Sequence, residues 1–466
     1  MKGGVGLSPW ESEPRCTDCM EGKPTPLWRN KDYLLLWSGQ IVSTAGSQMS
    51  LLALPLLVLF LTNSPLQAGL VGAIGRLPYS LLCLPAGALV DRWNRKRMMI
   101  LSDTGRMIAL ASIPVAFLFG GPSLVQLYIV SLVEGTFYVF FDIAQVASLP
   151  NVVEKEQLPA AAMQTIVTFS MSLLLGPFLG GLLYGIKQFL PFLVDAITYA
   201  GSVVSLSFIK RDFQKQRTAV PNKVGIEIRD GLLWLWRQPL VFFLALLAFS
   251  VQLIGSSTKL ALIVDAHQFK STTPFLIGLI FLLGGIGGMV GSIAGGILQK
   301  RFRLWSVTVG IQALLILFWV LYVFANHAIL LGLISIFTYG LFGAYNVVQF
   351  SYRLAIIPDQ LQGRVNSVFR LIAFAGEPLG LLLAGLLLQA IGPVPTILAA
   401  LGFLVVLTVV TIPNPHMRKA PHISQILTQE TSLPEAPLAQ ASLAEAAFPE
   451  ADLAEVLLPE ISLPEA

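Results

Sequence analysis

The sequence GALVDRWNRKR, residues 87–97, stands between two long apolar segments. One acid and four cations crowd into a turn too short to be a domain: Asp91, Arg92, Arg95, Lys96 and Arg97. Small residues at Gly87 and Ala88 would let the preceding helix lie close against a neighbour. Short loops rich in Lys and Arg stay on the cytoplasmic side of a membrane. The stretch therefore predicts a cytoplasmic turn between two membrane-spanning helices.

The composition agrees with a membrane protein. The 466 residues are 55% hydrophobic and only 12% charged, with a mean hydropathy of +0.73, whereas a soluble domain carries roughly a quarter charged residues. Apolar segments of about 20 residues recur, each long enough to cross ~30 Å of hydrocarbon as a helix. We predict an all-α membrane protein. The net charge of +4 does not indicate nucleic-acid binding, because the cations lie in loops between spans.

Hydropathy predicts twelve transmembrane helices. They cover residues 33–61, 67–90, 98–119, 124–147, 160–186, 189–209, 239–263, 274–298, 304–325, 328–351, 366–389 and 393–412. Loop cations gather on one side of these spans, and only Lys187 and Lys270 lie in loops of the other side. This asymmetry places both termini in the cytoplasm. We expect the protein to lie in the plasma or inner membrane of the cell.

The spans divide into two six-helix halves. We expect a cytoplasmic leader over residues 1–32, a first half over 33–210, a linker over 211–238 and a second half over 239–414. The linker contains a short interfacial helix with Leu232, Leu233 and Trp236 on one face. The loop GGILQKRFR (295–303) occupies in the second half the place of GALVDRWNRKR, without its acid. Two equivalent halves are expected of a transporter built from internal repeats.

Residues 415–466 differ in composition from the rest. Blocks such as SLPEA and SLAEA begin ten residues apart, proline recurs and aromatic residues are nearly absent. We expect a disordered acidic tail, and partner binding by this tail stays an alternative. Cys16 and Cys19 form a lone Cys-x-x-Cys pair, which lacks the further ligands of a zinc site. We expect no metal site and no cofactor.

Charged residues inside spans are costly, and each is a functional candidate. In the fourth span, Glu134, Tyr138, Asp142 and Gln145 form one polar stripe at helical spacing. We expect Glu134 or Asp142 to take up a proton or to meet a cationic substrate. We also expect Arg76 of the second span to pair with Glu134, either for structure alone or as part of a site.

Other charged residues in spans have two interpretations each. Glu377, before Pro378, is a second acid at mid-depth, or it bonds to backbone that the proline frees. Asp195, Lys259 and Asp265 lie near span ends and are interpreted as interfacial anchors. Asp103 and Arg106 are expected to form a structural charge network with the basic turn. Polar stripes in spans one and ten suggest a cavity shared by the two halves: Gln40, Ser43, Ser47 and Ser50, then Tyr339, Tyr345, Asn346 and Gln349.

The order Gly-x-Leu-x-Asp-Arg-x-x-Arg-Lys in residues 87–96 resembles the signature of the major facilitator superfamily of secondary transporters, with Asn94 where glycine is often found. GPFLGG, with Gly176, Pro177, Gly180 and Gly181, is similar to part of a motif of proton-coupled drug exporters, or serves helix packing alone. Residues 27–40, 90–103, 149–161 and 357–368 resemble the branch with macrolide-efflux proteins and the enterobactin exporter.

The resemblance implies that Asp91 and its basic neighbours meet the start of span eleven in one conformation. Many members carry an acid near position 47 or 48, where this chain has Ser47 and Gln48. We therefore expect a monomeric secondary transporter that exports an amphipathic small molecule, with protons as the coupling ion. Export of a siderophore or metabolite is the second hypothesis, and a non-transporting scaffold or sensor with an acidic tail is the third. No phosphate-binding Gly-x4-Gly-Lys-Ser/Thr loop or nucleophile motif occurs, so we expect no enzyme.

Overall fold

The computed structural model describes residues 27–154, 157–210, 213, 224–269, 272–325, 327–357, 361–423 and 425. Every regular element of these residues is helical. Within this described part of the chain, twelve helices are long and apolar enough to cross a membrane, as the sequence predicts. The predicted ends of the spans lie within five residues of the observed ends, and the largest differences are at the ends of α4 and α11.

Six helices form the first half: α1 (Lys31–Thr62), α2 (Pro65–Arg92), α3 (Arg95–Leu118), α4 (Leu124–Val152), α5 (Leu158–Ile186) and α6 (Leu190–Phe208). Six more form the second half: α8 (Pro239–Val264), α9 (Pro274–Arg301), α10 (Leu304–Phe324), α11 (Ala328–Ile356), α12 (Gln362–Ile391) and α13 (Pro393–Thr411). The short helices η1 (Leu27–Arg29), α7 (Val224–Arg237), η3 (Asp265–Phe269) and α14 (Pro415–Arg418) complete the chain.

Short polar residues start several of these helices. The side chains of Ser64, Asn94 and Ser123 each accept a hydrogen bond from a backbone N–H of the first turn of α2, α3 and α4. Such caps satisfy donors that the helix itself leaves free. Asn94 thus begins α3 directly after the short turn at Trp93. This cap explains how the chain turns at residue 94 without a glycine.

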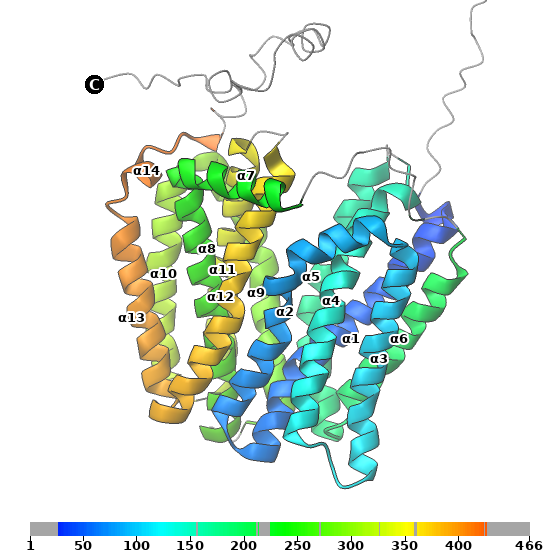
Figure 1. Cartoon of the computed structure of the whole chain (residues 1–466). Coiled ribbons are helices and arrows are strands. Elements are labelled where there is room, and N and C mark those ends of the chain that lie inside the picture. The colour runs from blue at the N-terminus through cyan, green and yellow to red at the C-terminus, as the bar shows by residue number, and fades with distance from the viewer. Residues whose placement is uncertain are drawn as a thin grey trace, which may run out of the picture.

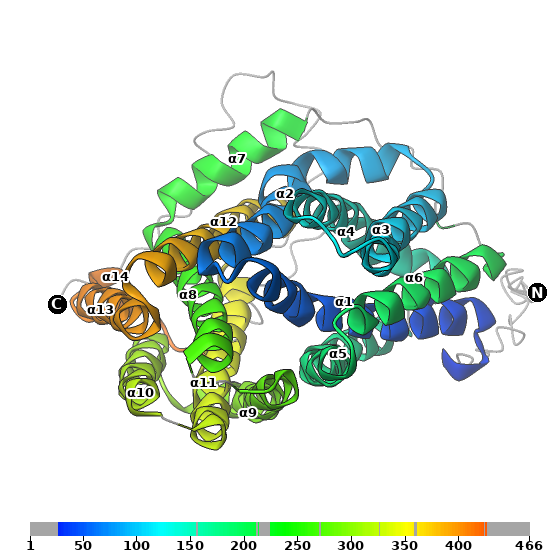
Figure 2. The same ribbon diagram turned by 90° about the horizontal axis from the view of Figure 1, so that it is seen from below.

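Each half has its own packing, and the two halves touch through two helix pairs. In the first half α1 packs on α5 and α6, and α4 packs on α2 and α3. In the second half α9 packs on α11 and α8 packs on α12. The halves meet where α2 lies against α12 and α5 lies against α9, which are side by side in Figure 2.

Glycines bring the backbones together at both inter-half contacts. A Cβ on Gly69 would lie 2.6 Å from the carbonyl oxygen of Leu381 and 2.8 Å from Cα of Gly385. A Cβ on Gly278 would lie 2.9 Å from the carbonyl oxygen of Pro177. No real side chain fits at such distances, so these two helix pairs are in backbone contact. Small residues of this kind are the usual means of close helix packing in membranes.

The halves part towards one end of the bundle. Contacts between α2 and α12 begin at Ser64 and Gln389, whose Oγ and Oε1 atoms are 2.9 Å apart. They continue to Tyr79 and Phe374, whose rings are 5.3 Å apart. The last part of α2, a helix that contains Pro78 and Pro85, bends away from α12 over the first half (Figures 1 and 2).

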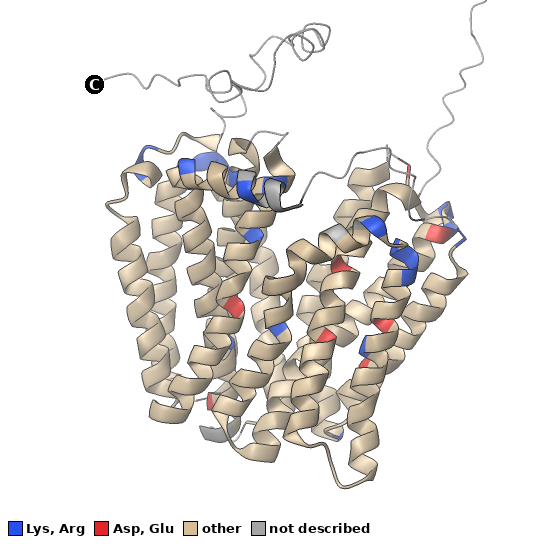
Figure 3. Cartoon of the chain, viewed as in Figure 1, with Lys and Arg blue, Asp and Glu red and all other residues tan. Residues whose placement is uncertain are grey.

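We call the end at which the described chain begins and finishes the terminal end, and the other the opposite end. Lys and Arg gather at the terminal end, whereas charged residues inside the bundle are few (Figure 3). α7 lies across this end against α12, with Leu235 fully buried and Trp236 exposed (Figure 1). Met417 of α14 is also fully buried, so the packed chain extends past the expected boundary at residue 415.

Candidate functional site: charged residues between the halves

An ion pair joins the two halves at mid-depth. Arg76 of α2 and Glu377 of α12 approach to 3.1 Å between Nε and Oε1, and about a quarter of each side chain is exposed (27% and 26%). The expected pairing of Arg76 with Glu134 is therefore wrong, because the neighbour that faces Arg76 comes from the other half. The backbone carbonyl of Glu377 instead accepts a hydrogen bond from Ser256.

A second cation lies close to this pair. Lys259 of α8 is within electrostatic range of Arg76 and Glu377, and its Nζ lies 5.8 Å from the centre of the Phe281 ring. Lys259 therefore faces the interior of the protein, and its interpretation as an interfacial anchor is wrong. Two cations and one acid leave this part of the contact with an excess of positive charge.

The second bridge between the halves lies nearer the terminal end. Asp142 of α4 accepts a hydrogen bond of 3.0 Å from the hydroxyl of Tyr79 and lies 3.7 Å from the guanidinium of Arg370 on α12. Arg370 also donates to the hydroxyl of Tyr79 and lies beside the Phe374 ring. The Tyr79 and Tyr138 rings are 6.0 Å apart. Asp142 and Tyr138 of the predicted stripe thus take part in this bridge.

Arg106 is the centre of a buried polar cluster in the first half. Its guanidinium binds Glu134 of α4 through Nε (3.2 Å) and Nη2 (2.5 Å), and it lies 3.8 Å from Asp103. It also stacks over the Tyr199 ring at 4.3 Å. Asp103 and Arg106 form a charge network as expected, but its partner is Glu134 rather than the basic turn.

Asp195 belongs to the same half and is fully buried. Ser50 of α1 donates to it at 2.5 Å, and Thr198 donates to it at 3.3 Å. Its interpretation as an interfacial anchor is therefore wrong, because α1 covers it. Ser47 of α1 shares a hydrogen bond of 2.7 Å with the hydroxyl of Tyr199. The serines of α1 thus face α6 inside the first half.

The polar stripe of α11 lies inside the second half in the same way. Gln349 donates to the hydroxyl of Tyr345 at 2.5 Å and to the backbone of Leu244 at 3.1 Å. Gln40 and Ser43 of α1 are buried, whereas Asn346 is exposed and Gln145 is partly buried. The hydrogen-bonded side chains of these stripes therefore have their partners within their own halves.

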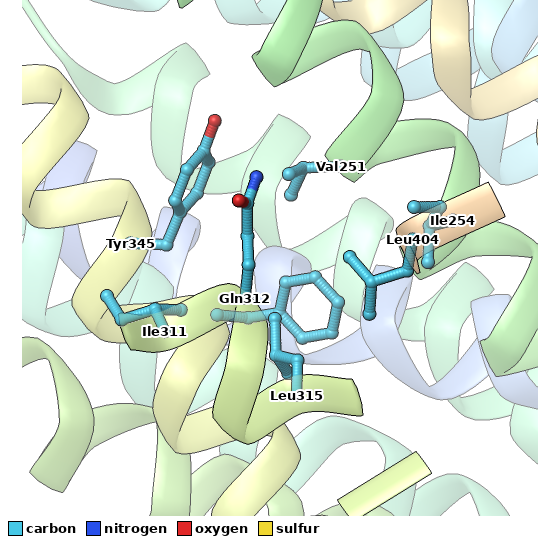
Figure 4. A pocket seen from close by; sticks show the side chains of 8 residues that line it. Val251, Ile254, Ile311, Gln312, Leu315, Tyr345 and Leu404 are labelled. Atoms are coloured by element: carbon cyan, nitrogen blue, oxygen red, sulfur yellow. The ribbon is translucent and has the colours of Figure 1, made fainter. Parts of the chain in front are cut away.

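A small apolar pocket lies within the second half (Figure 4). Its wall includes Val251, Ile254, Leu315 and Leu404, and Gln312 and Tyr345 turn their polar ends to the same side of it. It contains no charged side chain and does not reach α2 or α4. The charged contacts between α2, α4 and α12 are therefore the better candidate for the functional site.

The two ion pairs between the halves depend on the relative position of the halves. Arg76–Glu377 and Asp142–Arg370 each combine one residue of the first half with one of the second, and they do so with opposite polarity. Separation of the halves here would leave four charges without partners inside a membrane, which is costly unless water or a ligand replaces the partners.

The family profile described as Major Facilitator Superfamily matches residues 36–380, well over half of the chain. The chain belongs to this superfamily. Its relatives include a multidrug efflux pump, Tap, of Mycolicibacterium fortuitum, with 26% identity over 83% of this chain and 96% of the relative.

Two further members of the superfamily match the branch that the sequence resembles. The enterobactin exporter EntS of Citrobacter koseri is 25% identical over 72% of this chain and 79% of its own length. Macrolide efflux protein A of Streptococcus pyogenes is 24% identical over 78% and 91%. Among solved structures, an inward-facing bacterial homologue of the iron transporter ferroportin has a TM-score of 0.68 at 16% identity, over 84% of this chain and 99% of that one.

The basic residues of the superfamily signature at residues 87–97 donate hydrogen bonds to backbone groups of the first half. Arg95 donates to the backbone of Ala147 at 2.6 Å, and Lys96 donates to the backbone of Ile209 at the same distance. Gly87 has open space around it, so its small size does not serve close helix packing there. The side chain of Asp91 lies outside the described residues, and so do Cys16 and Cys19.

The glycines of GPFLGG pack helices, as one interpretation of the superfamily motif proposes. A Cβ on Gly180 would lie 2.7 Å from the carbonyl oxygen of Met49 on α1, and Gly176 faces Gln48 of the same helix. Gly181 instead faces Pro274 and Gly278 of α9 in the other half. The glycines of the motif therefore bring α5 into close contact with α1 of its own half and with α9 of the other half.

Five residues of these contacts were missed as site candidates at the sequence level: Tyr79, Asp195, Lys259, Arg370 and Tyr199. Arg370 lies in the predicted span 366–389, so the cost of a buried charge could have marked it. The two tyrosines carry no such signal, since aromatic residues are common in membrane helices. Their role depends on which helices are neighbours.

Proposed function

We propose that this protein is a secondary active transporter that exports amphipathic small molecules, such as macrolide-like drugs, in exchange for protons. The observation that carries the proposal is the pair of reciprocal ion pairs between the halves, Arg76–Glu377 at mid-depth and Asp142–Arg370 nearer the terminal end. Relatives named as a multidrug efflux pump and a macrolide efflux protein support this direction and substrate class. The protein would act as a monomer.

We infer that the terminal end faces the cytoplasm of the cell, because Lys and Arg gather there. In this orientation the halves are in contact towards the outside and part towards the cytoplasm. Substrate would enter between the halves from the cytoplasm or the inner leaflet. The leader, the linker and the acidic tail would all lie on the cytoplasmic side.

Alternating access would depend on the charged contacts between the halves. When the halves rock, the partners of Arg76–Glu377 and Asp142–Arg370 must change, and a substrate or a proton can supply the replacement. We propose Glu134 and Asp142 as the acids that meet substrate and proton, because each is partly exposed (29%) beside the inter-half contact. Asp91 and the basic turn would bias which way the protein faces.

Everted membrane vesicles with an imposed pH gradient test this function. We expect vesicles that contain the protein to accumulate macrolides or other amphipathic drugs, and a protonophore to abolish the accumulation. Drug accumulation that ignores the protonophore would exclude proton coupling. Drug uptake into right-side-out vesicles instead would indicate import.

A siderophore or an endogenous metabolite is the alternative substrate, supported by the relative named as an enterobactin exporter. The same vesicles distinguish the two classes of substrate. Only the class that the protein exports should accumulate in the vesicles and compete for transport.

A scaffold or sensor that uses the acidic tail is the third hypothesis, and a truncation tests it. The truncation should remove residues 426–466 and leave Met417 in place, because Met417 is fully buried and Tyr352 donates to the backbone of Pro421 at 3.0 Å. We expect the truncated transporter to retain its full rate. A wild type that shows no transport, and whose cellular effect is lost when the folded protein is truncated, would favour the scaffold.

A further inference from the structure

The buried cluster of the first half contains more acids than bases. Asp103, Glu134 and Asp195 surround one guanidinium, Arg106. Glu134 takes two hydrogen bonds from Arg106, while Asp103 lies at 3.8 Å and is bonded to Ser202 at 2.6 Å. A single positive charge cannot neutralise three carboxylates.

Asp195 is the acid of this cluster without an ion pair. Within the described part of the chain, its hydrogen-bonding partners are hydroxyl groups, those of Ser50 and Thr198, and its side chain is fully buried. A buried carboxylate without a cation is strongly disfavoured in its charged form, and such a group binds a proton instead.

The surroundings of Asp195 offer no other charge compensation. α1 contributes the hydroxyl group of Ser50 and no charged residue at this level, and α5 has no charged residue between Leu158 and Ile186, with Tyr184 as its one ionisable group. α3 contributes Asp103 and Arg106, and α4 contributes Glu134 and Tyr138. Of these, Arg106 and Glu134 are close enough to act on Asp195 electrostatically.

The cluster also connects Asp195 with the exposed face of the site. Tyr199 lies one helical turn after Asp195 on α6, and its hydroxyl reaches Ser47 at 2.7 Å and Glu134 at 3.4 Å. Glu134 is the partly exposed acid of the cluster. Glu134 is therefore the outlet that this network offers to a proton from Asp195. The structure shows hydrogen bonds from Tyr199 to Ser47 and Glu134, and the step from Asp195 to Tyr199 requires a water or a movement of Ser50.

We propose that Asp195, held by Ser50 between α1 and α6, is the site that carries the coupling proton in this conformation. The carboxyl group binds the proton when α1 covers it, and gives it to Glu134 or water when α1 shifts against α6 within the first half during the transport cycle. Glu134 then acts as the relay beside Arg106. This inference rests on the proposed proton-coupled function and names its site.

Infrared spectroscopy of the purified wild-type protein in sodium-free buffer at neutral pH tests the bound proton without any substrate. We expect a carbonyl band of a protonated carboxyl group that is absent in Asp195→Asn and retained in Asp32→Asn, an acid-to-amide control at the far end of α1. Ser50→Ala should shift the frequency of the band, because its hydrogen bond is lost. Absence of the band in the wild type, or its persistence in Asp195→Asn, would overturn the proposal.

Vesicle transport separates this proposal from the function on which it rests. We expect Asp195→Asn to fold and to move erythromycin down its gradient, while accumulation driven by a pH gradient falls at least about tenfold, or ~1.4 kcal/mol. Accumulation in Asp195→Asn at the wild-type level would refute Asp195 as the site. A wild type that ignores the protonophore would refute the coupling itself, whatever the variant does. If Asp195→Asn fails to fold, Ser50→Ala is measured in its place, because it keeps the acid and removes the hydrogen bond to it.

Discussion

At the scale of residues, the protein depends on where charges find partners inside a membrane. Arg76, Glu377, Asp142 and Arg370 pair across the halves, whereas Arg106 and Glu134 pair within one half. The ion pairs between the halves must change partners when the halves move, whereas the Arg106–Glu134 pair need not. Ion pairs with opposite polarity side by side also fix the register of α2 and α4 against α12.

A charge exchange tests the inter-half pair. Arg76→Glu or Glu377→Arg alone places like charges at 3.1 Å and should lower transport at least about tenfold, or ~1.4 kcal/mol. The double variant should recover much of the activity, since contacting residues couple by about 0.5–3 kcal/mol. Transport rates and the amount of folded protein are measured for all three. Equal loss in the single and double variants would show that the two residues act separately.

At the scale of elements, close approach of helices depends on glycines at particular turns. α9 and α11 pack tightly because Gly291 faces the backbone of Gly340, and Gly287 faces that of Ile336. A side chain at either position would meet backbone atoms, which cannot move aside. The helix period places these glycines on one face of α9, but the sequence does not say which helix they meet.

Gly291→Ala should lower the thermal stability of the folded protein, by about 1–3 kcal/mol for overpacking. Gly296→Ala on the same helix is the matched control, since nothing lies within 4 Å of a Cβ there. In a helix, alanine is otherwise favoured over glycine by roughly 1 kcal/mol, so the control should be neutral or stabilising. Thermal unfolding in detergent measures both. Equal stability of the two variants would contradict the packing of α9 on α11.

At the scale of the whole molecule, the two halves are in contact at the opposite end and part at the terminal end. α2 and α12 follow each other from Ser64–Gln389 to Tyr79–Phe374, and α2 then bends away. Alternating access requires the contacts at the opposite end to open in turn. A link that fixes them should therefore stop the cycle.

Ser64→Cys and Gln389→Cys together provide such a link, in a chain whose Cys16, Cys19 and Cys83 are replaced by serine. We expect oxidation to form a disulfide between α2 and α12, to reduce drug accumulation in vesicles to background, and a reductant to restore it. Each single-cysteine variant is the control and should ignore the oxidant. Full transport by the cross-linked protein would show that these ends stay together throughout the cycle.

The twelve helices can be predicted from the sequence alone, because each span must satisfy its backbone within one apolar segment. The sequence also determined the superfamily, through the ordered residues of GALVDRWNRKR, and Glu134, Asp142 and Glu377 as costly charges. Hydropathy and local order are properties of neighbouring residues, so they can be read along the chain.

Which charges are partners depends on the packing of the helices in three dimensions. Arg76 faces Glu377 instead of Glu134, and Asp195 lies under α1 instead of at the interface. Helix period fixes the face of a residue, but the rotation and neighbour of each helix come from the packing of glycines and side chains far apart in the sequence. That packing sets an unpaired acid beside a single arginine, and the chemistry of the protein follows from it.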